Sequence, residues 1–352
     1  MAYSSISKPS LYFNTKLYTG TGSSNALTGV GFQPGLTWIK QRNESRNHAW
    51  FDAVRGVTKL ISSSSNGAQS TQSNGLTAFG ADGFTVVSHD DVNKSSGTYA
   101  SWNWLAGGAA SSNTDGSITS SVSANTTAGF SIVTYTGTGS NATIGHGLNA
   151  VPKMYIARNI TDNEQWTTYH VELDNSAPED YHVRLNTNDA RVDEASVWND
   201  TAPTSSVFSV GSSGAPNGPG DTHIAYCFAE KKGYSKIGKY SGNGNADGTF
   251  VYTGFKPALI IIKDRDNAGE NWFIFDNKRP GHNFNANLLN PNSTTTETTS
   301  GANGIDILSN GFKMRSTNNG TNRSGGDGFM YMAIAEEPLV ANVGAGIPTT
   351  AR

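Results

Sequence analysis

The phrase "TYTGTGS" stands at residues 134–140, and close variants stand at 17–23 ("LYTGTGS") and at 239–245 ("KYSGNGN"). The tyrosines of the three phrases are separated by 117 and 105 residues. Gly137 and Gly139 can adopt positive φ, so the phrase predicts a tight turn that follows a strand. A phosphate-binding loop would need a following helix, and no helical pattern follows any of the three phrases.

Further landmarks recur in the same order after each phrase. A glycine-rich turn reaches a proline, an apolar run follows, and a cation stands six residues after the proline. An aromatic segment, a strand with a phenylalanine and an apolar closing strand come next. The cations are Lys40, Arg158 and Lys263, and the aromatic segments are "HAWFD" (48–52), "WTTYH" (166–170) and "WFIFD" (272–276). A period of this length is the size of a small domain and too long for a solenoid unit.

The pattern within one unit is typical of β-structure. "FTVVSH" (84–89) places large residues at every second position, which indicates a sheet with one buried face. "LIIIK" (259–263) is continuously apolar and predicts a strand buried on both faces. Turn signals recur every few residues, and no segment has a good amphipathic helix pattern. The sequence therefore predicts an all-β protein of three tandem homologous antiparallel β-sandwich domains, most simply jelly rolls.

These landmarks set the domain boundaries. The three β-sandwich repeats span 13–107, 129–231 and 232–337 and are called repeats 1, 2 and 3 below. The Gly/Ser/Thr-rich stretch 108–128 is predicted to be a linker, whereas the short junction between repeats 2 and 3 predicts close packing. Residues 1–12 and 338–352 read as terminal arms, which we expect neighbouring subunits to order in a homo-oligomeric assembly.

Composition excludes several classes of protein. The 352 residues carry a net charge of −3 without a Lys/Arg cluster, so the sequence predicts no nucleic-acid partner. No apolar run reaches 18 residues, which predicts no membrane insertion, and the first ten residues lack the apolar core of a secretory signal. Cys227 is the single cysteine, so no intramolecular disulfide forms, and synthesis in a reducing compartment is expected.

The tryptophans can either stack on sugar rings at the surface or pack in a hydrophobic core. Trp166 and Trp272 occupy equivalent positions, which favours core packing for both. Trp102 and Trp104 lie two apart on the closing strand, where core or inter-domain packing is again favoured. The closing strands of the other repeats place Tyr226 and Phe228, then Tyr331 and Ala333, near there. Trp198 lies in a predicted loop and is the candidate for an exposed glycan contact.

Charged pairs and acidic clusters have structural readings. The segments 51–56 and 275–281 share an Asp and an Arg three residues apart, whereas repeat 2 has His170 and Leu173 there, so a site common to all repeats is excluded. The predicted structural pairs are Asp52–Arg55 and Asp276–Arg279. The acidic residues of "DRDNAGE" (264–270) suit calcium in type, but the full twelve-residue loop pattern is missing.

No catalytic motif stands out. The sequence contains neither G-x-S-x-G nor H-E-x-x-H, and His146 lies in a predicted turn without a partner that the sequence identifies. The sequence leaves open a pair of carboxylates for sugar hydrolysis, because two acidic residues far apart in sequence can lie close together in the fold. Low charge and a repeated architecture argue against a dedicated active site. The sequence predicts a protein that is not an enzyme, with no metal site and no cofactor.

Taken together, the landmarks resemble a repeated module of marine tailed-phage virion proteins, of cyanophage and pelagiphage type. Repeat 1 carries the resemblance in "YTGTGS", "GVGFQPGLTWIKQRN" and "SGTYASWNW", repeat 2 in "GFSIVTYTGTGSNATIGHGL", and repeat 3 in "DGTFVYTGFKPALIIIK". The resemblance covers 13–337, and repeat 2 departs from it at His170. It implies a virion structural protein made in the host cytoplasm, with concanavalin-like jelly rolls that contact glycans. It brings no catalytic residues.

Three functions follow as hypotheses. The first is a tail fibre or tail appendage that adheres to host-surface polysaccharide, with other virion proteins as partners. The second is a head decoration or knob protein bound to the capsid. The third, from another class, is a glycan depolymerase or a free carbohydrate-binding module, which a cleft with two facing carboxylates would identify. The fold alone does not decide among them.

Overall fold

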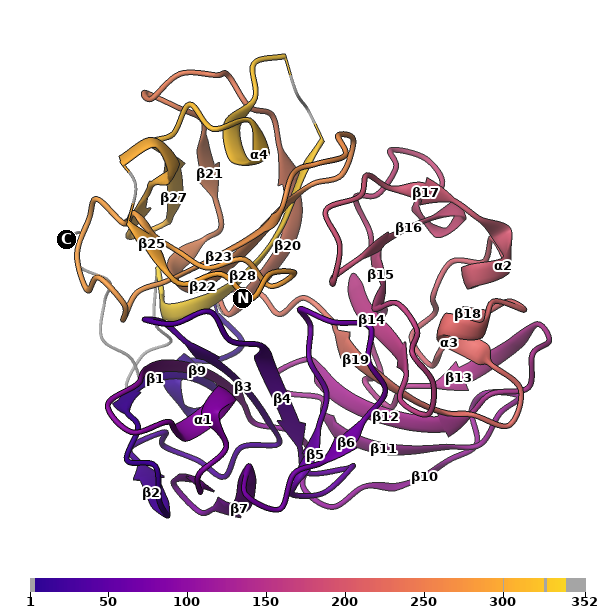
Figure 1. Ribbon diagram of the computed structural model, residues 1–352. Coiled ribbons are helices and arrows are strands. Elements are labelled where there is room, and N and C mark those ends of the chain that lie inside the picture. The colour runs from indigo at the N-terminus through magenta and orange to yellow at the C-terminus, as the bar shows by residue number, and fades with distance from the viewer. Residues whose placement is uncertain (1–3, 300, 326–327, 340–352) are drawn as a thin grey trace.

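The computed structural model describes residues 4–299, 301–325 and 328–339 (Figure 1). It is nearly all-β, with 42% strand against 7% helix, and its ladders are antiparallel apart from one isolated bridge. The three repeats lie around a common centre, with repeat 1 in indigo, repeat 2 in magenta and repeat 3 in orange to yellow (Figure 1). The all-β prediction is therefore confirmed.

Repeat 1 contains one four-stranded and one three-stranded sheet, in the orders β1-β9-β3-β4 and β2-β8-β7. Its closing strand lies between the first and second strands of the larger sheet. The strands are β1 (Phe13–Thr19), β2 (Asn25–Thr28), β3 (Leu36–Gln41), β4 (His48–Asp52), β5 (Lys59–Leu60), β6 (Ser70–Thr71), β7 (Leu76–Gly80), β8 (Gly83–Val86) and β9 (Thr98–Trp104). The helices are η1 (Pro9–Leu11), before the repeat, and α1 (Asp90–Asn93).

Repeat 2 has the same strand order, β12-β19-β14-β15, within an eight-stranded sheet, and the pair β13-β18 forms its small sheet. The strands are β12 (Phe130–Thr136), β13 (Ala142–Gly145), β14 (Met154–Asn159), β15 (Thr167–His170), β16 (Tyr181–Arg184), β17 (Val192–Asp193), β18 (Val207–Val210) and β19 (Thr222–Phe228). The helices are η2 (Pro178–Asp180), α2 (Ala195–Trp198) and α3 (Gly214–Asn217).

Repeat 3 follows the same scheme, with the orders β20-β28-β22-β23 and β21-β27-β26. The strands are β20 (Ser235–Tyr240), β21 (Phe250–Tyr252), β22 (Phe255–Asp264), β23 (Trp272–Asp276), β24 (Asn287–Leu288), β25 (Thr298–Thr299), β26 (Ile305–Leu308), β27 (Gly311–Met314) and β28 (Phe329–Pro338). The helices are η3 (Gly301–Asn303) and α4 (Asn319–Asn322). The sheet order of the three repeats thus carries the internal repetition seen in the sequence.

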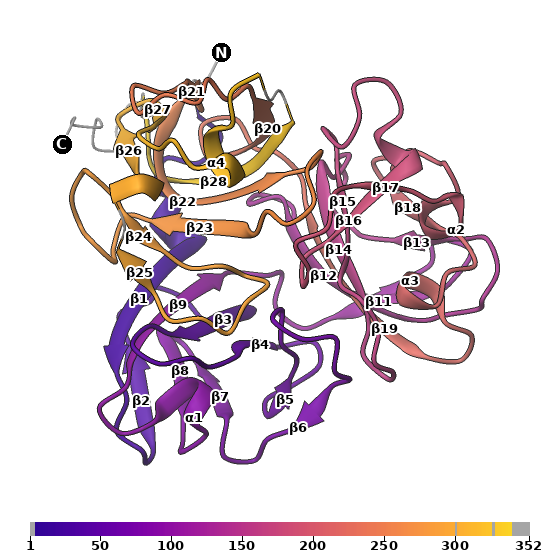
Figure 2. The same ribbon diagram turned by 45° about the horizontal axis from the view of Figure 1, so that its top comes forward.

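Each four-stranded sheet is buried on both faces. On β22, Ile260 and Ile262 pack in a core with the small sheet of repeat 3. Leu259 and Ile261, which point the other way, join a central core that all three repeats share. This arrangement confirms that "LIIIK" is buried on both sides, and β22 and β23 lie beside the sheet of repeat 1 in Figure 2.

The central core is rich in aromatic side chains. It contains six tryptophans, namely Trp38, Trp50, Trp102, Trp104, Trp166 and Trp272, each at most 2% exposed. Trp50 of repeat 1 meets Trp166 of repeat 2 with a centroid distance of 5.2 Å. Each buried aromatic side chain contributes roughly 1.5–3 kcal/mol through removal of apolar surface from water. The predicted core placement of Trp102, Trp104, Trp166 and Trp272 is confirmed.

The register of the closing strands corrects one assignment. Tyr18, Tyr135 and Tyr240 pair with Tyr99, His223 and Phe329, respectively. Counting along from these pairs, the residues equivalent to Trp102 and Trp104 in repeat 3 are Met332 and Ile334, not Tyr331 and Ala333. A slip of one residue moves a side chain to the opposite face, and Tyr331 accordingly lies in the core of repeat 3 itself.

The predicted linker and the N-terminal arm are both folded. Within 108–128, β10 (Ser111–Asn113) and β11 (Ser120–Asn125) continue the sheet of repeat 2 beyond β12 (Figure 1). Residues 4–12 were expected to be ordered by a neighbouring subunit, but they pack on their own chain. The Ser5 N–H, for example, donates to the Lys232 carbonyl at 3.0 Å. Ile6 enters the central core. Of the predicted C-terminal arm, residues 340–352 lie outside the described residues.

The glycines of the repeated phrase have two different roles. Gly139 has a φ of +69°, which favours glycine, as predicted. Gly137 has no positive φ, so that part of the prediction is wrong. A Cβ on Gly137 would instead lie 2.2 Å from the Gly218 carbonyl oxygen, so glycine is needed there for close backbone approach.

A buried asparagine holds each of these turns. In repeat 2, Asn217 Oδ1 accepts from the Thr138 N–H at 2.8 Å, and Nδ2 donates to the carbonyls of Ser140 (2.7 Å) and Gly211 (2.6 Å). The equivalent residues are Asn93 and Asn322, at the ends of α1 and α4. The role of these asparagines was not predicted, although an asparagine recurs about 80 residues after each phrase.

We expect Asn217→Ala to lower the free energy of unfolding by about 1–3 kcal/mol, because it leaves a buried N–H and two carbonyls without partners. Denaturant unfolding followed by fluorescence measures the change. Asn66→Ala, at an exposed position, is the control and should stay within about 0.5 kcal/mol of the wild type. Equal effects of the two substitutions would contradict the turn-holding role of Asn217.

Candidate functional site

The three cations that follow the prolines lie where the repeats meet. Lys40, Arg158 and Lys263 are each 0% exposed. Each head group donates to a backbone carbonyl of another repeat, and the three contacts close a ring around the centre. The pairs are Lys40 with Thr294 (3.1 Å), Arg158 with Gly67, and Lys263 with Asn188 (3.5 Å). These cations therefore join the repeats.

Burial also lowers the pKa of these three cations. It lowers the pKa of Lys40 and of Lys263 to about 8 and that of Arg158 to about 10, because the charged forms lose hydration. The negative charges of Asp91 near Lys40, and of Asp264 and Glu270 near Lys263, act in the opposite direction. Lysines with a lowered pKa occur at catalytic sites, but here the ammonium groups donate hydrogen bonds to backbone carbonyl oxygens.

The next landmark residue also joins two repeats in two of the three copies. Trp166 Nε1 donates to the Ser65 carbonyl of repeat 1 at 3.1 Å, and Trp272 Nε1 donates to the Arg184 carbonyl of repeat 2 at 2.9 Å. In repeat 1 the residue is His48, whose Nδ1 accepts from Trp38 Nε1 at 2.8 Å within the same repeat. Burial holds the pKa of His48 well below its usual value, so the imidazole is neutral.

The two Asp–Arg pairs predicted from the sequence are present and fully buried. Asp52 Oδ2 lies 2.5 Å from Arg55 Nε, and Asp276 Oδ2 lies 2.6 Å from Arg279 Nε. Each of these carboxylates also binds the closing strand of the next repeat. The contacts are Tyr226 Oη to Asp52 (2.8 Å) and Trp102 Nε1 to Asp276 (3.1 Å).

Repeat 2 makes the same joint with different chemistry. His170 Nε2 lies 3.2 Å from the Tyr331 carbonyl oxygen of repeat 3. Burial lowers the pKa of His170 to about 4, so the ring is neutral and donates from Nε2. Leu173 replaces the arginine and joins the central core. These ionisable groups thus form structural joints between the repeats.

The acidic loop after β22 is neutralised by arginines. Asp266 pairs with Arg191 at 3.1 Å, and Glu270 pairs with Arg323 at 2.8 Å. Asp264 Oδ1 accepts from the Asp266 N–H at 3.0 Å. Within residues 4–299, 301–325 and 328–339, no group of three or more His, Cys, Asp or Glu side chains is arranged to hold a metal ion.

The predicted exposure of Trp198 is wrong. The residue ends α2 and is 0% exposed. Its indole packs edge-to-face against Tyr155 at 4.8 Å, inside the core of repeat 2. The predicted loop forms a short helix that turns the side chain inward, so Trp198 cannot stack on a glycan in this structure.

A wide surface hollow lies at the edge of repeat 3. It has a volume of about 380 Å³ and lies between β20 and β21, with Lys153, Glu172 and Tyr331 at its borders. Two side chains of β21 stand out from the surface there, Phe250 at 44% and Tyr252 at 59% exposure. A second hollow of about 230 Å³ adjoins it and shares Lys236 and Tyr252. We call the two together the β20–β21 hollow.

Ion pairs surround the β20–β21 hollow. Lys153 and Lys236 both bind Glu230, at 3.1 and 3.2 Å, and Lys239 binds Glu172 at 3.2 Å. The two glutamates only partly offset the four lysines that line the hollow, Lys153, Lys232, Lys236 and Lys239, so the hollow combines exposed aromatic rings with a border of net positive charge. This site was not predicted from the sequence, because the alternation in "FVY" is also the pattern of an ordinary strand with one buried face.

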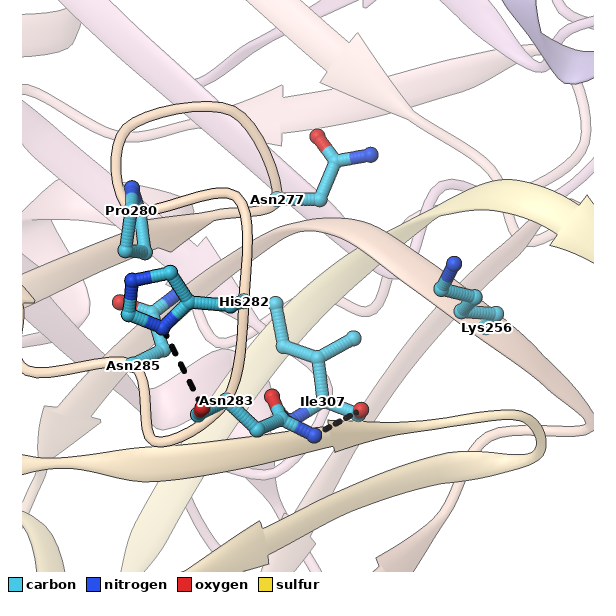
Figure 3. A pocket seen from close by; sticks show the side chains of 7 residues that line it. All are labelled: Lys256, Asn277, Pro280, His282, Asn283, Asn285 and Ile307. Carbon is cyan, nitrogen blue, oxygen red and sulfur yellow. Dashed lines mark hydrogen bonds between the residues drawn. The ribbon is translucent and has the colours of Figure 1, made fainter. Parts of the chain in front are cut away.

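A smaller pocket in repeat 3 is too tight for an organic ligand (Figure 3). Its volume is about 10 Å³, room for about one water molecule. Asn283 Nδ2 donates to the Ile307 carbonyl at 2.8 Å across its floor. Lys256, at its border, is paired with Glu336 at 2.7 Å. This pocket is a site for water, and the β20–β21 hollow stays the candidate for a partner.

Asp276→Ala should lower the free energy of unfolding by about 2–4 kcal/mol, because Arg279 Nε and Trp102 Nε1 lose their buried acceptor, although Glu297 still pairs with Arg279 at 3.1 Å. Chemical denaturation measures the loss. Asp189→Ala, which breaks an exposed ion pair with Arg184, is the matched control and should cost about 0–1 kcal/mol. A cost for Asp276→Ala as small as that of the control would contradict the structural role of this joint.

The buried lysines predict a specific pH dependence. The pKa of Lys263 is about 8 in the folded chain and about 10.4 in an unfolded one, so the unfolded chain binds more protons between these values. The contribution of Lys263 to stability therefore becomes more favourable as pH rises from 8 to 10. Relative to Lys263→Met, the wild type should gain about 1–2 kcal/mol of unfolding free energy over this interval.

Unfolding curves at pH 8, 9 and 10 measure this difference. Lys278→Met, at an exposed position, is the control, and its difference from the wild type should stay constant. A constant difference for Lys263→Met as well would show that Lys263 titrates in the folded chain as it does in the unfolded one.

Comparisons with known proteins place the chain in a family without assigning an activity. No curated protein and no solved structure matches it. Among the described residues, no helix is long and apolar enough to cross a membrane. One family profile matches residues 8–338, which span all three repeats. The chain therefore belongs to the family described as "Domain of unknown function (DUF7483)".

Proposed function

We propose that the chain is a non-enzymatic structural protein of a phage virion, displayed on the particle surface as a tail fibre component or tail appendage. The motifs quoted from the three repeats support the virion assignment through their resemblance to the marine tailed-phage module. In this proposal the protein is made in the host cytoplasm and incorporated into the virion with other virion proteins, as a homo-oligomer.

The observation that carries the structural role is the use of buried ionisable groups as joints. Lys40, Arg158 and Lys263 bind carbonyls of neighbouring repeats, and the Asp–Arg pairs bind the next closing strand. Repeats joined by buried contacts of this kind suit a protein that bears load or presents a surface.

We further propose that each repeat is a jelly-roll domain of the concanavalin-like kind. Each repeat supports this assignment with a four-stranded antiparallel sheet that shares a core with a smaller one. Such domains often bind glycans, and host-surface polysaccharide is the adhesion target in this proposal. Trp198 is not the contact residue, because it is buried.

Immunogold labelling of purified virions tests the proposal. An antibody against the full chain should label the tail tip or the fibres of intact particles, and antibody absorbed with the purified chain is the control. Label over the head shell would support the alternative, a head decoration protein bound to the capsid. Intact virions without label would contradict surface display and favour a free carbohydrate-binding module or a depolymerase.

A further inference from the structure

Repeat 2 shows how one open edge of this fold is covered. Residues 116–125 run along the edge between β12 and β13. In β11, Val122 pairs with Val133 of β12, and upstream the Ile118 N–H donates to the Thr143 carbonyl of β13 at 3.0 Å. Val122 and Ile118 are 5% and 9% exposed and belong to the core of repeat 2. The segment thus closes both sheets and completes the core.

Strand registers identify the same edge in repeat 3. The pairs Tyr135–His223 and Tyr240–Phe329 make β20 equivalent to β12, so Gly238 takes the place of Val133. Phe208 and Phe312 occupy equivalent positions on β18 and β27. Their partners Ile144 and Val251 are therefore equivalent, and Phe250 and Tyr252 take the places of Thr143 and Gly145.

The equivalent edge of repeat 3 is uncovered among the described residues. The β20–β21 hollow lies where residues 116–125 lie in repeat 2, since its lining includes β20 from Lys236 to Tyr240 and all of β21. At the position where Val133 meets Val122, repeat 3 has Gly238, and the ring of Tyr331 lies against it, since a Cβ on Gly238 would stand 3.2 Å from Tyr331 Oη. Phe250 and Tyr252 project into solvent there.

A side chain occupies the position of a strand acceptor on this edge. The Ile237 N–H donates to Glu230 Oε2 at 3.3 Å. Ile237 is equivalent to Ile132, which pairs with Ser123 of β11 in repeat 2. The carboxylate therefore occupies the region where an added strand would place a backbone carbonyl. This N–H needs an acceptor, and the one present is on a side chain that can move.

Repeat 1 treats the same edge differently. The residue equivalent to Val133 and Gly238 is Lys16 on β1. The pKa of Asp82 is lowered mainly by hydrogen bonds from the backbone N–H groups of Gly29 and Gly31, and the positive charge of Lys16 lowers it further. A lysine on an edge strand is a common guard against strand addition. The lysines of β20, Lys236 and Lys239, are instead paired with Glu230 and Glu172. Among the described residues no further strand lies beside β20, and the exposed rings of Phe250 and Tyr252 flank this edge.

We propose that the edge between β20 and β21 binds an extended segment of a different protein, which adds to β20 as a strand in the way that β11 adds to β12. The segment would place a small apolar side chain opposite Gly238 and cover Phe250 and Tyr252. Main-chain hydrogen bonds would supply affinity, and the hollow would select the side chain. The border has more lysines than glutamates and therefore disfavours a basic segment, so we expect one that resembles 116–125, which has no basic residue.

This inference extends the proposed assembly role, which supplies the partner, but the edge exists whether or not the chain belongs to a virion. A fluorescent peptide of residues 116–125 is the probe, and anisotropy with the full chain measures binding. We expect saturable binding that a peptide with Val122→Lys lacks. Gly238→Lys should weaken binding at least tenfold, because its side chain fills the position that Lys16 fills in repeat 1.

Asn66→Lys, which adds the same charge at an exposed position of repeat 1, is the matched control and should bind the peptide as the wild type does. Thermal unfolding checks that both variants fold. No saturable binding, or equal binding to Gly238→Lys, would overturn the proposal while leaving virion labelling unaffected. Self-association abolished by Gly238→Lys would name a second copy as the occupant and overturn it as well. So would an oligosaccharide that binds the hollow when the peptide does not.

Discussion

Burial of the four-stranded sheets on both faces is the constraint on which the rest of this structure depends. A strand such as β22 sends Ile260 into its own repeat and Ile261 into the shared centre. Water is thereby excluded from both sides of the sheet. Any polar or charged group on these strands must then find its partner inside the protein, because an unpaired buried group costs several kcal/mol.

The joints between repeats follow from this constraint. Lys40 and Lys263 lie at the ends of buried strands, and their ammonium groups reach carbonyl oxygens supplied by another repeat. The indole N–H groups of Trp166 and Trp272 do the same. Each repeat therefore supplies acceptors that its neighbour needs, and an isolated repeat would lack them. Folding of one repeat is coupled to the presence of the other two.

Position matters more than residue type at these joints. Asp52 and Asp276 accept hydrogen bonds from side chains of the next repeat, whereas His170 approaches a backbone carbonyl and has no charged partner. Both solutions satisfy a buried polar atom at the same corner. A charged pair and a neutral imidazole are interchangeable here, since neither leaves an uncompensated charge. This explains how the repeats diverged in sequence while keeping one sheet order.

Much of this architecture was predictable from sequence, because repetition exposed the landmarks. The run at 259–263 indicated burial on both faces, and the spacing of Trp166 and Trp272 indicated core. The strands within 108–128 were not predictable, since Ser and Thr alternate there with few apolar residues. Trp198 was misplaced because α2 is only four residues long, too short for a helical period. The function of each cation stayed hidden, because its acceptor lies in another repeat.

The open edge shows the limit of sequence reasoning most clearly. Val133, Lys16 and Gly238 stand at one strand position in three copies, and only the fold makes them equivalent. Val133 is covered by a strand from the same chain, and Lys16 places a charge on its edge. Among the described residues no strand lies beside Gly238, and the lysines next to it on β20, Lys236 and Lys239, are held by Glu230 and Glu172. An unpaired strand edge is a liability that proteins normally avoid, and addition of a strand is the interaction that the backbone groups of such an edge suit.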